Sequence, residues 1–94
     1  MKNTNISEIE ECERELVDLR EKHQLDQYEK RAFSTIEERL SFMRRRVLTG
    51  RTGEQDQLRG VIARLVVEQN PSILSPELGG RLIAIENKFY KENA

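Results

Sequence analysis

A chain of 94 residues is long enough for one domain, near the lower end of the length that supports an independent core. Charged residues make up 35% and apolar residues 36%, with only two Pro and five Gly, which excludes a turn-rich β fold and favours amphipathic helices. The net charge of −1 argues against a dedicated nucleic-acid-binding protein, whose domain is usually basic, and no apolar run approaches the length of a membrane span.

The first predicted element is a long helix over residues 7–49. Apolar residues step by three and four along it, which is the spacing of a coiled-coil seam. The step changes phase near residues 23–26, through either a stutter in one helix or a short break. Asp26 and Glu29 have the spacing to cap a second helix, but we favour one continuous helix because no Gly or Pro stands there. We expect the seam to form the interface of a homo-oligomer, through Ile9, Leu16, Leu19, Tyr28, Phe33, Ile36, Leu40, Met43 and Val47.

Two shorter helices are predicted after the long one. Gly50 and Gly53 separate it from a helix over residues 54–69, which Pro71 ends. Ser75 and Pro76 then have the order typical of a helix start, N-cap followed by first turn, and predict a helix over residues 76–92. The fold class is therefore all-α: a single domain over residues 1–94, with the last two helices paired as a hairpin.

Charge is distributed unevenly along the chain. Residues 1–38 hold six Lys or Arg and eleven Asp or Glu, a net charge of −5, whereas residues 39–94 hold ten and six, a net charge of +4. Two such regions attract each other, either within one chain or between chains.

No pattern of residues predicts catalysis. His23 is the only histidine and Cys12 the only cysteine, so one chain has neither a His-based triad nor a multi-His metal site, and Cys12 lies in an acidic stretch that disfavours a thiolate. We expect a non-enzymatic protein without a metal or cofactor. A single cysteine and the lack of an apolar segment after Met1 favour a cytoplasmic location.

A charged row in the middle of the chain is the strongest candidate for a binding site. Residues spaced by three and four fall along one face of the predicted helix: Glu37, Ser41, Arg44, Leu48 and Thr52. Three more arginines stand close by: Arg45, Arg46 and Arg51. Arginine and serine in such a row suit a phosphate or a purine. The alternative is a cationic helix end that complements the helix dipole and pairs with the acidic first half of the chain.

The same stretch resembles the RsiG-like anti-sigma family, whose coiled-coil helices hold cyclic di-GMP. The family signature is Glu, three residues, Ser, two residues, Arg, three residues, Gln, three residues, Asp. Its first three positions match Glu37, Ser41 and Arg44 within the run Leu40-Ser41-Phe42-Met43-Arg44-Arg45, whereas Leu48 and Thr52 replace its Gln and Asp. The likeness covers about residues 30–53. It implies a ligand site made of Glu37, Ser41, Arg44, Arg45 and Arg51 in a homodimer that sequesters a sigma factor.

The predicted function is thus a non-enzymatic regulatory binding protein, an anti-sigma-like adaptor responsive to a cyclic dinucleotide. The alternative is a helical protein–protein interaction module, an inhibitor or chaperone-like adaptor with no small-molecule ligand. Nucleic-acid binding by residues 44–64 is less favoured because Glu54 and Asp56 interrupt the basic region. The layout is also comparable to that of chorismate mutases, but Ile36 stands where that family needs an inward-facing Arg.

Overall fold

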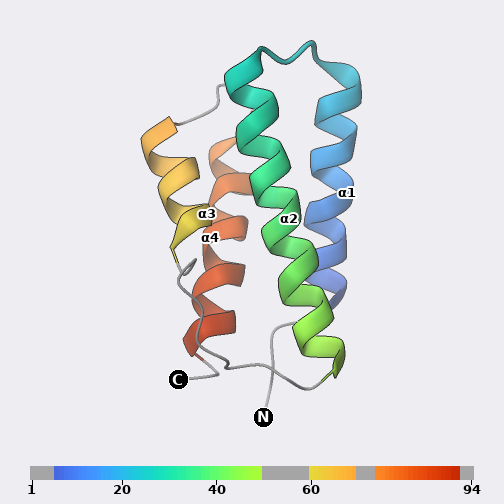
Figure 1. Cartoon of the computed structure of the whole chain (residues 1–94), viewed down its shortest axis with the longest axis vertical. Coiled ribbons are helices and arrows are strands. Elements are labelled where there is room, and N and C mark those ends of the chain that lie inside the picture. Colours follow the sequence, from blue (N-terminus) through green and yellow to red (C-terminus); the bar gives the residue numbers. More distant parts are fainter. Residues whose placement is uncertain (1–5, 50–59, 70–73, 92–94) are drawn as a thin grey trace.

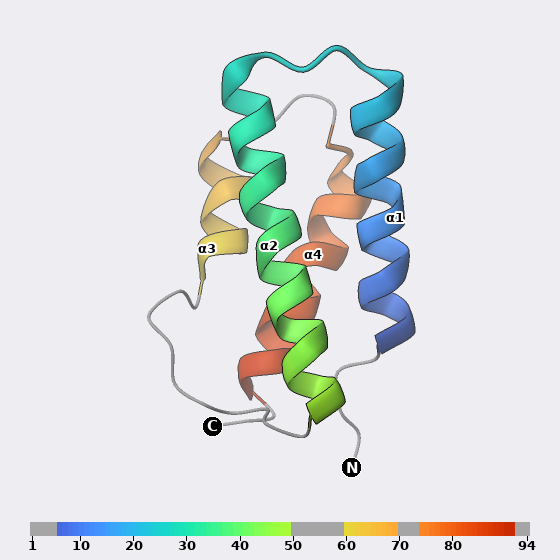
Figure 2. The same cartoon turned by 45° about the vertical axis from the view of Figure 1, so that its right-hand side comes forward.

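The computed structural model describes residues 6–49, 60–69 and 74–91, and this part of the chain is mainly helical and contains no strand. Helix α1 (Ile6–Lys22) and helix α2 (Gln27–Thr49) run antiparallel (Figure 1). Helix α4 (Pro76–Lys91) packs against α1. Helix α3 (Val61–Arg64) continues as the π-helical segment η1 (Leu65–Gln69). Figure 2 shows α4 behind the α1–α2 pair and α3 beside α2, on the side away from α1. The carboxyl-terminal ends of α2 and α4 lie at the same end of the molecule.

The expected continuous helix over residues 7–49 is wrong, because the chain turns back at residues 23–26. The backbone N–H of Glu29 donates to Asp26 Oδ1 at 2.8 Å, and the backbone N–H of Asp26 donates to Glu29 Oε1 at 3.1 Å. This reciprocal capping box starts a new helix without Gly or Pro. His23 is exposed in the turn, whereas Leu25 is buried. The break, and not the stutter, accounts for the change of phase.

The predicted seam residues mostly form the core of one chain and not an interface between chains. Six of the nine are fully buried within the single chain: Ile9, Leu16, Phe33, Ile36, Leu40 and Met43. Leu19 and Val47 pack partly buried against this core. Tyr28, in contrast, is 76% exposed. Since α2 folds back on α1, the apolar stripes of the two helices cover each other, and α4 covers the rest with Leu82, Ile85 and Phe89. Self-association stays a prediction, but in this fold these six side chains are not available to it.

The second half of the chain agrees in part with the predicted helices. The predicted start of α4 is confirmed, because the backbone N–H of Leu78 donates to Ser75 Oγ at 3.1 Å. Of the helix predicted over residues 54–69, the structure describes residues 61–69 as helical, and residues 54–59 lie outside the described part. Helix α3 packs against α4 and α2. No helix in the described part of the chain combines the length and apolar character of a membrane-spanning segment.

Two contacts from α4 position α3 and η1. Gly60, with φ of 89°, precedes α3 and offers no capping side chain, so Glu86 of α4 supplies the cap instead. Glu86 is 1% exposed, and its carboxylate accepts hydrogen bonds from the backbone N–H groups of Ile62 (3.1 Å) and Ala63 (3.2 Å). Further along, a Cβ on Gly79 would lie 2.9 Å from Val66 Cγ1, so glycine permits η1 to approach α4 this closely.

Candidate functional site

The charged row predicted on α2 lies against α1. Arg20 Nη1 of α1 donates to Glu37 Oε1 at 2.9 Å, and Arg44 Nε donates to Glu13 Oε1 of α1 at 3.1 Å. Ser41 lies between these two positions in the sequence and is half-buried. Glu37 and Arg44 lie on one face of α2, as their spacing predicts, and both pair with residues of α1. The ligand site itself stays a prediction. Arg51, the last of the predicted ligand residues, lies outside the described part of the chain.

Basic residues of the second half of the chain pair with acidic residues of the first half within the same chain. Arg81 of α4 donates to Glu11 Oε1 at 2.7 Å and to Glu15 Oε2 at 2.8 Å, both on α1. Together with Arg44–Glu13, these contacts join the basic second half to the acidic first half. Each is partly exposed and contributes at most about 1 kcal/mol to stability. The interpretation of the basic stretch as a partner of the acidic half is thus correct for Arg44.

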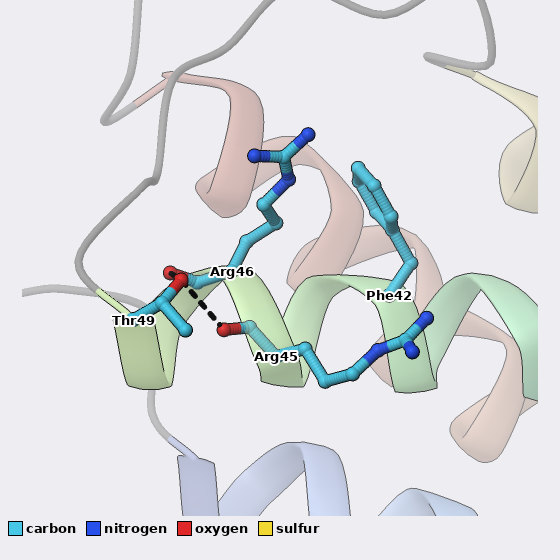
Figure 3. A pocket seen from close by; sticks show the side chains of 4 residues that line it. All are labelled: Phe42, Arg45, Arg46 and Thr49. Atoms are coloured by element: carbon cyan, nitrogen blue, oxygen red, sulfur yellow. Dashed lines mark hydrogen bonds between the residues drawn. The ribbon is translucent and has the colours of Figure 1, made fainter.

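A different face of α2 carries a surface hollow of about 340 Å³. It is lined by four residues at positions i, i+3, i+4 and i+7 of the helix: Phe42, Arg45, Arg46 and Thr49 (Figure 3). The hollow lies at the carboxyl-terminal end of α2, where the end of α4 also lies. Of its four lining residues, only Arg45 belongs to the predicted ligand site.

The Phe42 ring is held from several sides. The Phe89 ring of α4 meets it edge to face, with ring centroids 6.4 Å apart and an interplanar angle of 67°. The guanidinium carbons of Arg39 and Arg46 lie 4.6 Å and 5.0 Å from its centroid, within cation–π range. Arg39 is buried and donates from Nη2 to the Tyr90 hydroxyl of α4. These contacts fix the ring and hold a guanidinium group at the edge of the hollow.

Arg45 differs from the neighbouring arginines because it is exposed and pairs with no carboxylate in the described part of the chain. Beside it, the Thr49 hydroxyl lies 3.0 Å from the backbone oxygen of Arg45 and 3.2 Å from that of Arg46, and donates to these oxygens. Leu48, next in sequence to Thr49, is 65% exposed. A cationic group, a fixed aromatic ring and an exposed aliphatic side chain thus occur together, a composition typical of binding surfaces.

The two groups elsewhere in the chain that could take part in a reaction, the Cys12 thiol and the Glu86 carboxylate, are both buried. Burial raises the pKa of the Cys12 thiol to about 11, against the opposing effect of the Arg81 charge. The sequence had suggested neighbouring carboxylates as the cause, but their effect is smaller than that of burial. Both oxygens of Glu86 accept from backbone amides. Among residues 6–49, 60–69 and 74–91, no group of three or more His, Cys, Asp or Glu is placed to hold a metal ion.

Comparison with protein-family models, curated proteins and solved structures gives no match. The likeness to the RsiG-like family therefore stays a prediction based on residues 30–53. The sequence pattern predicts Arg45 as a ligand residue and places Arg46 nearby, but it does not predict Phe42 and Thr49 as residues that line a hollow. Their i, i+3, i+4, i+7 spacing was visible, yet the apolar character of Phe42 favoured a core position.

Proposed function

We propose that this chain is a non-enzymatic binding protein, a helical adaptor that recognises a protein partner with the carboxyl-terminal end of α2. The observation that carries the proposal is the exposed Arg45 guanidinium beside the Phe42 hollow. Arg20, Arg44 and Arg81 are all neutralised by carboxylates of the same chain. Arg45 keeps its charge available to another molecule, in the part of the chain that the structure describes.

The surroundings of the reactive side chains support a non-enzymatic role. A thiol with a pKa near 11 contains very little thiolate at neutral pH, so Cys12 is a poor nucleophile. Glu86 is enclosed and already bound to two amides, which leaves it no access to a substrate proton. His23 stands exposed in the turn between α1 and α2, away from the core.

A second candidate is the regulatory role that the RsiG-like resemblance implies, with cyclic di-GMP as ligand and a sigma factor as partner. The exposure of Arg45, a residue of the predicted ligand set, favours it. Glu37 and Arg44 oppose it, because both are engaged by α1. Cyclic di-GMP would have to displace Arg20 and Glu13 from these two residues before it could use the whole predicted row.

The adaptor proposal is tested by affinity capture with three immobilised baits: the wild type, Arg45→Glu and Arg31→Glu. Arg31 is a matched control because it is exposed on the same helix, at a separate hollow of about 190 Å³ shared with Gln27 and Tyr28. We expect a protein that the wild type and Arg31→Glu retain and that Arg45→Glu releases. Equal retention by all three baits would refute the α2 end as the recognition surface, and no retained protein would refute the adaptor role.

The second candidate is tested by calorimetric titration with cyclic di-GMP, with light scattering on the same sample. Micromolar or tighter binding that Arg44→Ala abolishes would establish the predicted row as a nucleotide site. Absence of heat from the folded protein would exclude it and leave the plain adaptor.

A further inference from the structure

The outward face of α2 is open to solvent in the part of the chain that the structure describes. Helices α1 and α3 flank α2, and α4 lies behind it (Figure 2). Exposed residues recur along this face at helical spacing: Gln27, Arg31, Ser34, Glu38, Arg45 and Thr49. The hollow at Phe42 and the smaller hollow at Tyr28 both lie along it, one towards each end of the helix.

Tyr28 leaves an aromatic ring in water. It is 76% exposed, more than any other large hydrophobic residue in the described part of the chain. Enclosing an aromatic side chain removes about 150–250 Å² of surface from water, which favours association with a second surface. Tyr28 and Phe42 stand 14 residues apart on one helix, roughly 21 Å along its axis. The Tyr28 ring therefore cannot reach the Phe42 hollow of its own chain, and a ring in that hollow comes from another molecule.

The Phe42 hollow has the composition of a site for an aromatic ring. Its volume is about 340 Å³, and the Phe42 ring forms part of its wall. Arg45 also lines it, exposed and without an ion pair in the described part of the chain. A guanidinium group is attracted to the face of an aromatic ring, and two rings attract each other edge to face. The contact needs only Arg45 as an available cation, so Arg46 keeps its place beside Phe42.

The charges along this face are complementary to a second copy of the same helix. Arg31, Glu38 and Arg45 follow each other at intervals of seven residues with alternating sign, and none of the three has an ion pair among the described residues. In an antiparallel pair with a two-fold axis near residues 36 and 37, position 28 of one helix faces position 45 of the other. Arg31 of each copy then lies about one turn from Glu38 of the other, within reach of these long side chains.

We infer that two copies of this chain associate through antiparallel α2 helices, with Tyr28 of each copy in the Phe42 hollow of the other. The contact forms twice, because a two-fold interface uses the same patch on both copies. Ser34 lies near the axis and is small enough to let the two helices approach. The inference goes beyond the adaptor function and does not depend on it. Since both use Arg45, a partner protein and a second copy exclude each other at this surface.

Analytical ultracentrifugation over a concentration series tests the association. Two enclosed rings and two exposed charge pairs make a small interface, so we expect a reversible dimer with a Kd on the order of 10–100 µM. Tyr28→Ala and Arg45→Glu should each weaken it about ten-fold or more, whereas Tyr28→Phe keeps the ring and should change it by less than about two-fold. Val67→Ala is the matched control, because Val67 is 68% exposed on η1, away from the α2 face. It should also stay within about two-fold of wild type.

Nuclear magnetic resonance tests the antiparallel register. An isotopically labelled copy is mixed with an unlabelled copy that carries a nitroxide at Gln24→Cys, an exposed position in the turn before α2. The label reacts there and not at Cys12, which is buried. With the axis near residues 36 and 37, position 24 of one copy faces position 49 of the other. We therefore expect the amide signals of Arg45 to Thr49 to broaden in the labelled copy.

Three results would overturn the inference. The first is a monomer at every concentration up to about 1 mM. The second is equal weakening by Val67→Ala and Tyr28→Ala, which would show non-specific apolar association. The third is broadening near residue 24 in place of Arg45 to Thr49, which would show a parallel pair. A monomeric wild type that still captures a partner through Arg45 would reject the second copy and leave the adaptor function intact. A dimer that Tyr28→Ala disrupts, with no captured protein, would do the reverse.

Discussion

Glu86 offers the sharpest test of how this fold is held together, because one side chain of α4 caps a helix that has no cap of its own. The perturbation is Glu86→Gln, which preserves the shape of the side chain and replaces one acceptor oxygen with an NH₂ group. One of the two amides, Ile62 or Ala63, then faces a donor and loses its hydrogen bond, and the other bonds to a neutral oxygen.

The expected loss of stability is about 2 kcal/mol. A buried amide without an acceptor costs about 1–3 kcal/mol, and the second bond weakens because its acceptor is no longer charged. Burying a neutral amide in place of a carboxylate offsets part of this cost. For a chain of this size, 2 kcal/mol lowers the melting temperature by roughly 8–16 °C.

Urea unfolding followed by circular dichroism measures the free-energy change, and amide hydrogen exchange locates it. The backbone N–H groups of Ile62 and Ala63 should exchange faster in Glu86→Gln, by more than those of α1. Glu38→Gln, at an exposed position in the middle of α2, is the matched control and should stay within about 0.5 kcal/mol of wild type. Equal stability of Glu86→Gln and Glu38→Gln, with unchanged exchange at Ile62, would refute the capping role.

Three further predictions concern stability and thiol chemistry. The pKa of Cys12 is raised from 9.0 to about 11, so between these pH values the folded protein holds a proton that the unfolded chain releases. The resulting stabilisation is present below pH 9 and is lost as the pH rises to about 11, which urea unfolding across this range checks. Thiol labelling at neutral pH should follow global unfolding. Gly80→Ala should stabilise the protein by about 0.5–1 kcal/mol in thermal melts, because Gly80 is exposed within a helix and no atom lies near the added Cβ. Gly79→Ala should not give this stabilisation, because its added Cβ would clash with the Val66 side chain. Asp26→Ala should cost about 1 kcal/mol in urea unfolding by removing the cap of α2, and an unchanged midpoint would contradict that cap.

Which side chains are buried was predictable from helical spacing alone, although the spacing was interpreted as an interface between chains and not as the core of one chain. Phe33, Ile36, Leu40 and Met43 recur at helical intervals, and all four are fully buried. The start of α4 was predictable for a similar reason, since Ser75 caps a backbone amide three residues away. Both features depend only on residues close together in the sequence.

The sequence contains a signal for the turn between α1 and α2, but the evidence for a continuous helix was given more weight. Asp26 and Glu29 carry the reciprocal capping signal, whereas the lack of Gly and Pro favoured a continuous helix. Once the hairpin closes, its consequences extend to the predicted ligand row, because α1 now covers Glu37 and Arg44. Which molecule covers a helix face is decided by tertiary contacts, and helical spacing does not show it.

The role of Glu86 was not predictable from local patterns. In the sequence it is one more charged residue on an amphipathic helix, and its partners are backbone amides 23 and 24 positions earlier. Backbone groups leave no signature in the amino-acid sequence. The hollow at Phe42 has the same origin, because Phe89 and Tyr90 of α4 position its ring and Arg39.

The source of the α3 cap also sets an order of folding during synthesis. Helices α1 and α2 carry their turn signal within four residues, so they can pair as soon as both have left the ribosome. Helix α3 emerges next but lacks its cap until Glu86 has been added, 24 residues after Ile62. At about 5–20 residues per second, α3 waits on the order of a second or more for the residue that completes it. A nascent chain that ends before Glu86 is therefore expected to hold a formed α1–α2 pair followed by an α3 segment without helical structure.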